Sequence, residues 1–126
     1  KLIKTINFNK LKYVGDPINV VKIFNDKNVD EIFIIDKSKK NFITGPDLDL
    51  IKKMTSECFV PLCYGGGIRN IDDAYSIFNL GVEKISVQKL ILENFNNLSL
   101  LVSKFGSSSI VFSVDIIKKK QQILCL

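Results

Sequence analysis

The sequence predicts an α/β fold that forms part of a (β/α)8 TIM barrel, and three observations lead to this class. Four apolar runs alternate along the chain with segments of helical periodicity. Each run is continuously apolar, which is typical of parallel strands buried on both faces. A polar residue or a glycine closes each run, at the position where barrels carry their functional groups.

The four expected strands begin 23 to 29 residues apart, a spacing that suits short strand–helix units. In chain order they cover residues 31–36, 60–64, 83–88 and 109–115. Because helical segments separate them, the strands are expected to run parallel in one sheet. We find no linker and no low-complexity segment between them.

Four helices are expected around this sheet. The first begins at Pro17, a residue that suits the first turn of a helix, and the last ends at Gly106, a typical C-cap. Their apolar stripes are Val20, Val21, Ile23 and Phe24; Leu48, Leu50, Ile51 and Met54; Ala74, Ile77, Phe78 and Leu80; and Leu98, Leu101, Val102 and Phe105.

Two architectures fit this order of elements, a doubly wound open sheet and part of a barrel. Dinucleotide-binding sheets carry their glycine loop after the first strand with the spacing G-x-G-x-x-G, whereas here three glycines follow an interior strand. Barrels carry their functional groups at the ends of several strands. The expected strands end in this way, at Asp36, Gly65–Gly67, Gln88 and Asp115, which favours the barrel. A whole barrel takes about 250 residues. We therefore expect residues 1–126 to be one domain, half of a barrel truncated at both ends and holding strands 2–5.

The composition excludes several kinds of chemistry. The chain has no histidine, which rules out Ser-His-Asp and Cys-His machinery and imidazole metal ligands. Its three cysteines form no zinc or catalytic motif, and their odd number favours a reduced, cytoplasmic protein. No apolar stretch has the length of a membrane span, and no metal or cofactor is indicated.

The net charge of +5 comes mostly from lysines that are spread along the chain. They lack the aromatic interleaving of a nucleic-acid surface, so we expect no nucleic-acid partner and no membrane partner. A solvated surface is the simpler interpretation of these lysines. An anionic, phosphate-bearing substrate is the second.

The run from Pro61 to Arg69 is the most informative segment. Its glycines, Gly65 to Gly67, leave backbone N–H groups without Cβ cover, so that a phosphate can approach them. A helix opened by Asn70 would add its positive end to such a site. A flexible corner between strand and helix is the alternative, because glycine is common wherever the backbone turns unusually.

Several motifs in order resemble a known family. They are Lys4-Thr5-Ile6-Asn7-Phe8, Gly15-Asp16-Pro17, Val29-Asp30-Glu31, Ile35-Asp36, Pro61 through Arg69, Leu80-Gly81-Val82-Glu83-Lys84, Phe105-Gly106-Ser107 and Val114-Asp115. Together they resemble the N-terminal half of the cyclase subunit of imidazole glycerol phosphate synthase, a barrel of the ribulose-phosphate-binding type. Lys4-Thr5 and the stretch 56–64 most resemble a paralogous branch that serves surface-sugar biosynthesis with an amidotransferase partner.

The resemblance implies a lyase of histidine biosynthesis that needs no cofactor. A glutaminase subunit would supply ammonia at one face of the barrel. At the other face, the ammonia would convert a bisphosphorylated ribulosyl aminoimidazole carboxamide nucleotide to imidazole glycerol phosphate. Asp115 matches one of two catalytic aspartates, and the other would precede Lys1, so we expect this fragment to be inactive alone.

The resemblance also implies binding roles. The residues that match the family's binding site for a substrate phosphate are Gly66, Gly67, Gln88 and Lys89. Lys4 matches a lysine of a mobile loop, and Asp36 matches an acid near the site. The ammonia entry is matched by Glu31 and Lys84. Gln88 and Lys89 depart from the family's Asn and small hydroxyl residue, which places the usual substrate in question. A noncatalytic half-barrel and a flavodoxin-like nucleotide-binding module stay open as alternatives.

Overall fold

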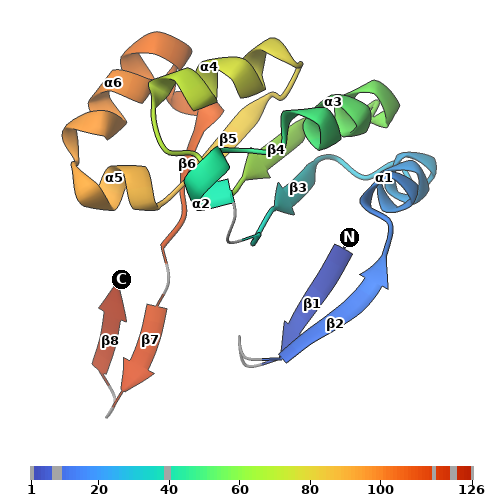
Figure 1. The fold of residues 1–126 in the computed structure, drawn as a ribbon, viewed down its shortest axis with the longest axis horizontal. Coiled ribbons are helices and arrows are strands. Elements are labelled where there is room, and N and C mark those ends of the chain that lie inside the picture. Colours follow the sequence, from blue (N-terminus) through green and yellow to red (C-terminus); the bar gives the residue numbers. More distant parts are fainter. Residues whose placement is uncertain (1, 7–9, 39–40, 115, 120–121, 126) are drawn as a thin grey trace.

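The fold is centred on one parallel sheet (Figure 1). The computed structural model describes the backbone of residues 2–6, 10–38, 41–114, 116–119 and 122–125, and the side chains of 16–38 and 43–114. The sheet has the strand order β3-β4-β5-β6. Its strands are β3 (Ile32–Ile35), β4 (Leu62–Gly65), β5 (Lys84–Val87) and β6 (Ile110–Phe112). All three neighbouring pairs are parallel, which confirms the expected α/β class.

Helices connect these strands in the expected alternation. They are α1 (Pro17–Asp26), α2 (Asn41–Thr44), α3 (Leu48–Glu57), α4 (Ile71–Asn79), α5 (Lys89–Glu93) and α6 (Asn96–Phe105), with a short 3-10 turn, η1 (Ser107–Ser109). The expected helices correspond to α1, α3, α4 and α6. Gly106 ends α6 at φ 89°, and its N–H donates to the Val102 carbonyl at 2.8 Å. Hydrophobic periodicity did not predict the short α2 and α5.

Side-chain caps set where three of the helices begin. The carboxylate of Asp16 accepts the N–H of Ile18 at 2.9 Å at the start of α1, which also carries Pro17 in its first turn. Asp47 caps α3 and Asn70 caps α4 in the same way. Such caps satisfy backbone donors that the helix itself leaves unpaired, so they fix the residues at which these helices begin.

The core lies between the sheet and helices α1, α3, α4 and α6. Each of these helices contributes side chains that are fully or almost fully buried, and the strands contribute further buried side chains from the face that the helices cover. The members with the lowest exposure are Val21, Ile51, Met54, Tyr64, Ala74, Ile77, Ile85, Ile91 and Leu101. Hydrophobic burial on this face therefore orients the whole sheet.

The opposite face of the sheet carries apolar side chains that the described helices do not cover. Phe33 is 50% exposed and Ile35 is 43% exposed, although both lie in β3. A doubly wound sheet would place helices on both faces, so the flavodoxin-like alternative does not fit. One helix-covered face and one apolar face are what the wall of a (β/α)8 barrel requires.

Two antiparallel hairpins flank this unit. They are β1 (Leu2–Ile6) with β2 (Lys10–Gly15), and β7 (Ile116–Lys119) with β8 (Gln122–Cys125). Figure 1 shows the chain leaving β6 toward β7, and both hairpins lie on that side of the sheet. The apolar runs did not predict either hairpin.

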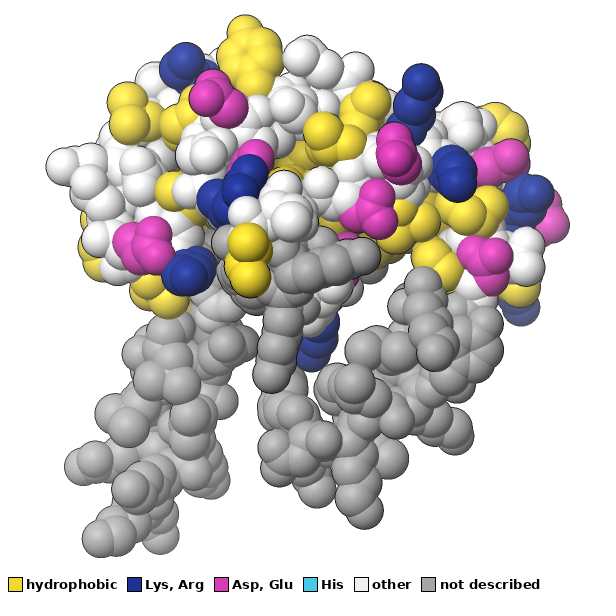
Figure 2. Space-filling model, in the orientation of Figure 1, with side chains coloured by type: hydrophobic (Ala, Val, Ile, Leu, Met, Phe, Trp, Pro, Cys, Tyr) yellow, Lys and Arg dark blue, Asp and Glu magenta, His cyan; other side chains and the backbone are white. Residues whose placement is uncertain are grey.

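The surface mixes charges of both signs. On the face drawn in Figure 2, Lys and Arg side chains lie among Asp and Glu side chains and form no continuous basic area among the residues described there. Within the part of the chain that the structure describes, no helix combines the length and the apolar character needed to cross a membrane.

We expect the substitution Ile51→Ala to lower the free energy of unfolding by about 2–5 kcal/mol, because it opens a cavity in the core. Ile51 is fully buried in α3, whereas Ile23 in α1 is 52% exposed. Ile23→Ala makes the same chemical change, and its expected loss is below about 1 kcal/mol. Urea unfolding measures both, and equal losses would contradict the described core.

Candidate functional site

The carboxyl ends of the four parallel strands meet along one rim of the sheet. Ile35 of β3 lies opposite Gly65 of β4, and Val87 of β5 lies opposite Phe112 of β6. Beyond the strands, the N–H of Asp36 donates to the Gly65 carbonyl at 2.8 Å. Groups that follow different strands therefore stand side by side, and this rim is the candidate site.

The glycine turn at the end of β4 has a shape that strongly favours glycine. Gly66 has φ 116° and Gly67 has φ 70°, both in the region that side chains disfavour. A Cβ on Gly66 would lie 2.0 Å from the carbonyl oxygen of Asp36. The backbones of β3 and the turn thus touch directly, and the N–H groups of the turn have no side-chain cover of their own.

The first glycine of the turn, Gly65, is required for a different reason. A Cβ there would meet the Cδ1 of Ile35 and the Cβ of Ser86, each at 2.8 Å. Ser86 is itself buried in β5, and its hydroxyl contacts that of Ser113, just after β6. This serine pair joins the ends of β5 and β6. Sequence reasoning did not single it out, although a serine within a buried apolar run is a signal.

The carboxylate of Asp36 is held by the protein on both oxygens. Its Oδ1 accepts the N–H of Ser38 at 2.9 Å, and its Oδ2 accepts the hydroxyl of the buried Tyr64 at 3.3 Å. Burial, followed by the nearby charge of Asp36, raises the pKa of Tyr64 far above its usual value. Tyr64 is therefore a neutral donor at every physiological pH, and sequence reasoning gave it no role.

Gln88 and Lys89 lie at the end of β5, where the short helix α5 begins. Lys89 forms an exposed ion pair with Glu93, with 3.8 Å between its Nζ and the carboxylate. Both side chains border a pocket of about 160 Å³ between this helix and the segment that follows the glycine turn. Its lining residues are Ile68, Arg69, Lys89, Leu90 and Glu93.

A larger hollow of about 520 Å³ lies on α3, lined by Asp49, Lys52, Lys53 and Ser56. All four residues belong to one helix, and none follows a strand. We place the candidate site at the smaller pocket, because its lining residues follow the glycine turn and the end of β5 in the chain.

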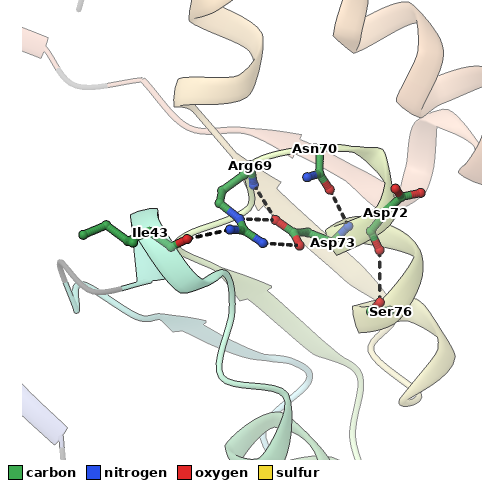
Figure 3. A network of polar contacts seen from close by, with 6 residues as sticks. All are labelled: Ile43, Arg69, Asn70, Asp72, Asp73 and Ser76. Carbon is green, nitrogen blue, oxygen red and sulfur yellow. Dashed lines mark hydrogen bonds and ion pairs between the residues drawn. The ribbon is translucent and has the colours of Figure 1, made fainter.

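Arg69 ties the segment after the glycine turn to two other parts of the chain (Figure 3). Its guanidinium donates to both carboxylate oxygens of Asp73, at 3.0 and 3.2 Å, and to the carbonyl of Ile43 at 2.7 Å. The same carboxylate accepts the backbone N–H of Arg69 at 2.9 Å.

Asp72 and Asp73 also place negative charge in the first turn of α4. The positive end of this helix is therefore already matched by carboxylates, so the backbone N–H groups of the glycine turn are the remaining candidate for anion binding.

At the opposite end of the sheet, Glu31 and Lys84 form an ion pair with 3.2 Å between Nζ and Oε1. The two residues stand at the starts of β3 and β5, so the pair spans β4 at Cys63. Burial, with the charge of Glu31, raises the pKa of the Cys63 thiol to about 11, although Lys84 opposes this rise. This thiol stays protonated and unreactive near neutral pH.

Two of the expected site residues cannot be placed. Asp115 lies outside the described residues. Lys4 belongs to β1, whose backbone is described but whose side chains are not. Among the residues that the structure does describe, no group of three or more Cys, Asp or Glu side chains could hold a metal ion.

Comparisons with known proteins point to one family. A family model described as "Histidine biosynthesis protein" matches residues 1–125. A Pseudomonas aeruginosa protein named "Putative imidazole glycerol phosphate synthase subunit hisF2" is 45% identical over 90% of this chain and 45% of its own length. A Campylobacter concisus protein named "Imidazole glycerol phosphate synthase subunit HisF" is 34% identical over 91% of this chain and 46% of its own length. The chain thus spans about half the length of the curated relatives it matches.

We expect Gly66→Ala to be much more destabilising than Gly81→Ala. Both glycines have positive φ, but a Cβ on Gly81 meets nothing within 4 Å. The backbone conformation alone costs about 1–2 kcal/mol, and the clash with Asp36 at position 66 should bring the loss to about 4 kcal/mol. Equal losses in urea unfolding would show that the close contact with Asp36 does not exist.

Cys63 should give the protein an alkaline stability loss. In the unfolded chain its thiol ionises near pH 9.0, whereas in the folded protein its pKa is raised to about 11. Below pH 9 the thiol is protonated in both states, so its pKa difference does not change the stability. Between pH 9 and 11 the thiol ionises in the unfolded chain but stays protonated in the folded protein, so the free energy of unfolding falls as the pH rises. The full shift corresponds to about 3 kcal/mol. Unfolding at pH 8 to 10.5 should show a steeper decline for the wild type than for Cys63→Ala, and parallel declines would contradict this.

Proposed function

Because this chain belongs to the histidine biosynthesis protein family, we propose that it carries part of the active site of an imidazole glycerol phosphate synthase cyclase subunit. The reaction would add ammonia to a bisphosphorylated ribulosyl aminoimidazole carboxamide nucleotide. Its products would be imidazole glycerol phosphate and an aminoimidazole carboxamide ribotide. Since the chain spans about half of its relatives, the activity is proposed for a protein of the relatives' length.

The observation that carries this proposal is the glycine turn on the rim. The N–H groups of Gly66 and Gly67 belong to a backbone with positive φ, directly before Ile68, which lines the pocket that Lys89 borders. Successive N–H groups of this kind bind phosphate, and a lysine adds a point charge. We assign one substrate phosphate to this place, with Gln88 as a further contact.

Within this chain, which has no histidine, we propose that an aspartate carries the catalytic role. We propose Asp115 as one member of a general acid–base pair, because it follows β6 by three positions and this strand ends on the same rim. Lys4 would lie over the site from the first hairpin. The remaining member of the pair would come from another part of the protein.

Ammonia would enter at the opposite end of the sheet. The Glu31–Lys84 ion pair lies there, and a glutaminase subunit bound at that end would deliver ammonia into the barrel. The exposed fraction of each side chain, 36% and 38%, allows the pair to open without unfolding the strands. The support for this assignment is the position of the pair at the strand starts.

A paralogue that supplies nitrogen for a surface sugar is the second candidate. The observation that favours it is Lys89, which stands at the pocket in ion-pair distance of Glu93. A long cation replaces the small hydroxyl residue of the family there, so the phosphate-bearing substrate would be gripped differently. The two candidates share the rim, the phosphate site and the ammonia entry.

The decisive assay supplies the full-length protein with ammonium and the ribulosyl nucleotide, and follows formation of imidazole glycerol phosphate. We expect turnover that Asp115→Asn lowers at least about 100-fold, because a general acid–base group contributes that much or more. Asp30→Asn, in the loop before β3, is the control and should keep full turnover. Absence of product from the wild type would reject the histidine-pathway function and leave the sugar paralogue.

Lys84→Met tests the ammonia entry. With glutamine and the glutaminase partner, turnover should change markedly, because the ion pair is lost while the length of the side chain is nearly kept. With free ammonium, turnover should stay within about twofold of the wild type. Lys104→Met, on the surface of α6, is the matched control, and equal effects of Lys84→Met in both assays would refute an entry role.

A further inference from the structure

The buried hydroxyl of Tyr64 joins three parts of the rim, and the proposed chemistry does not use it. Tyr64 is fully buried near the end of β4. Its hydroxyl donates to the carboxylate of Asp36, after β3, and a backbone hydrogen bond from Asp47 reaches the same oxygen. Asp47 is in turn the N-cap of α3. One phenol therefore links the end of β3, the end of β4 and the start of a helix.

Asp36 is bound to the glycine turn through its backbone as well. Its N–H donates to the carbonyl of Gly65, and its own carbonyl fills the space that a side chain at Gly66 would take. Its carboxylate is occupied by Tyr64 and by the N–H of Ser38. In these contacts the N–H, the carbonyl and the carboxylate of Asp36 all face other groups of the protein, and the backbone of Asp36 packs directly against the glycine turn.

We propose that Tyr64 and Asp36 are positioning residues, which hold the Gly66–Gly67 turn in the conformation that presents its N–H groups to a phosphate. The inference rests on the proposed phosphate role of this turn. Asp36 acts through its backbone and through Tyr64, and its carboxylate does not contact the anion. This differs from the binding role that the family resemblance implies for Asp36.

Two physical reasons support this division of roles. Successive glycines are the most flexible part of a chain, and ordering them at the moment of binding would weaken affinity. A neighbour that fixes them beforehand removes this cost. A carboxylate facing a phosphate would repel it, whereas a carboxylate turned toward a phenol and an N–H is stabilised locally by charge-assisted hydrogen bonds.

The test compares Tyr64→Phe and Asp36→Asn with Tyr75→Phe in the intact protein. Tyr75 lies on α4 and is 51% exposed, so its variant loses a hydroxyl without touching the rim. Two quantities are measured: the exchange rates of the Gly66 and Gly67 amide hydrogens, and the affinity for inorganic phosphate read from the Gly67 amide shift. The amide of Ile85 in β5 serves as a reference that the sheet is intact.

We expect Tyr64→Phe to speed exchange of the turn amides and to weaken phosphate binding at least about tenfold, the effect of losing one charge-assisted hydrogen bond. Asp36→Asn should weaken binding too, and the double variant should be no weaker than Asp36→Asn alone, because the two residues act as one unit. Tyr75→Phe should change neither quantity.

Opposite results would overturn the inference. If Asp36 faced the anion, Asp36→Asn would remove a repulsive charge and tighten phosphate binding. If Tyr64 served only the core, Tyr64→Phe would leave turn exchange and affinity equal to those of Tyr75→Phe. If the wild-type protein binds no phosphate, the phosphate role of the turn is rejected. If Tyr64→Phe nevertheless speeds amide exchange in the turn, the positioning role of Tyr64 is kept.

Discussion

The close approach of two backbones at Asp36 and Gly66 is the constraint on which the rest of the rim depends. With the Asp36 carbonyl in the place of a side chain, the turn after β4 must use glycine, and it takes positive φ. The same approach fixes how β3 and β4 end together, because Asp36 also donates to Gly65. The N–H groups of this turn have no side-chain cover of their own, and we propose that they bind an anion.

The two ends of the sheet carry different groups. At the carboxyl end lie the glycine turn, the buried phenol of Tyr64 and a small pocket lined by residues that follow β4 and β5. At the amino end, a partly exposed ion pair stands over a buried, protonated thiol. Parallel strands create this polarity, because every strand begins at one rim and ends at the other. This polarity is compatible with the proposed entry of ammonia at one end of the sheet and the proposed phosphate site at the other.

The sequence allowed the sheet and the long helices to be predicted, because hydrophobic periodicity determines both. It did not reveal α5, since five residues are too few to show a helical period after a strand. Neither hairpin was expected: the alternation of Leu11 and Tyr13 with lysines is short, and the apolar end near Ile123 shows no period. The glycine turn and the position of Glu31 and Lys84 at strand starts were visible in the sequence. The contacts of Tyr64, Ser86 and Arg69 were not, because each joins segments far apart in the chain.

Titration of the isotope-labelled protein with inorganic phosphate, followed at every backbone amide, tests whether the glycine turn binds an anion. We expect the amides of Gly66, Gly67, Gln88 and Lys89 to shift together and to saturate at one common phosphate concentration. Shifts that never saturate and gather on α3, around Lys52 and Lys53, would contradict it. They would show that the glycine turn is a structural corner and that anions meet only a solvated surface.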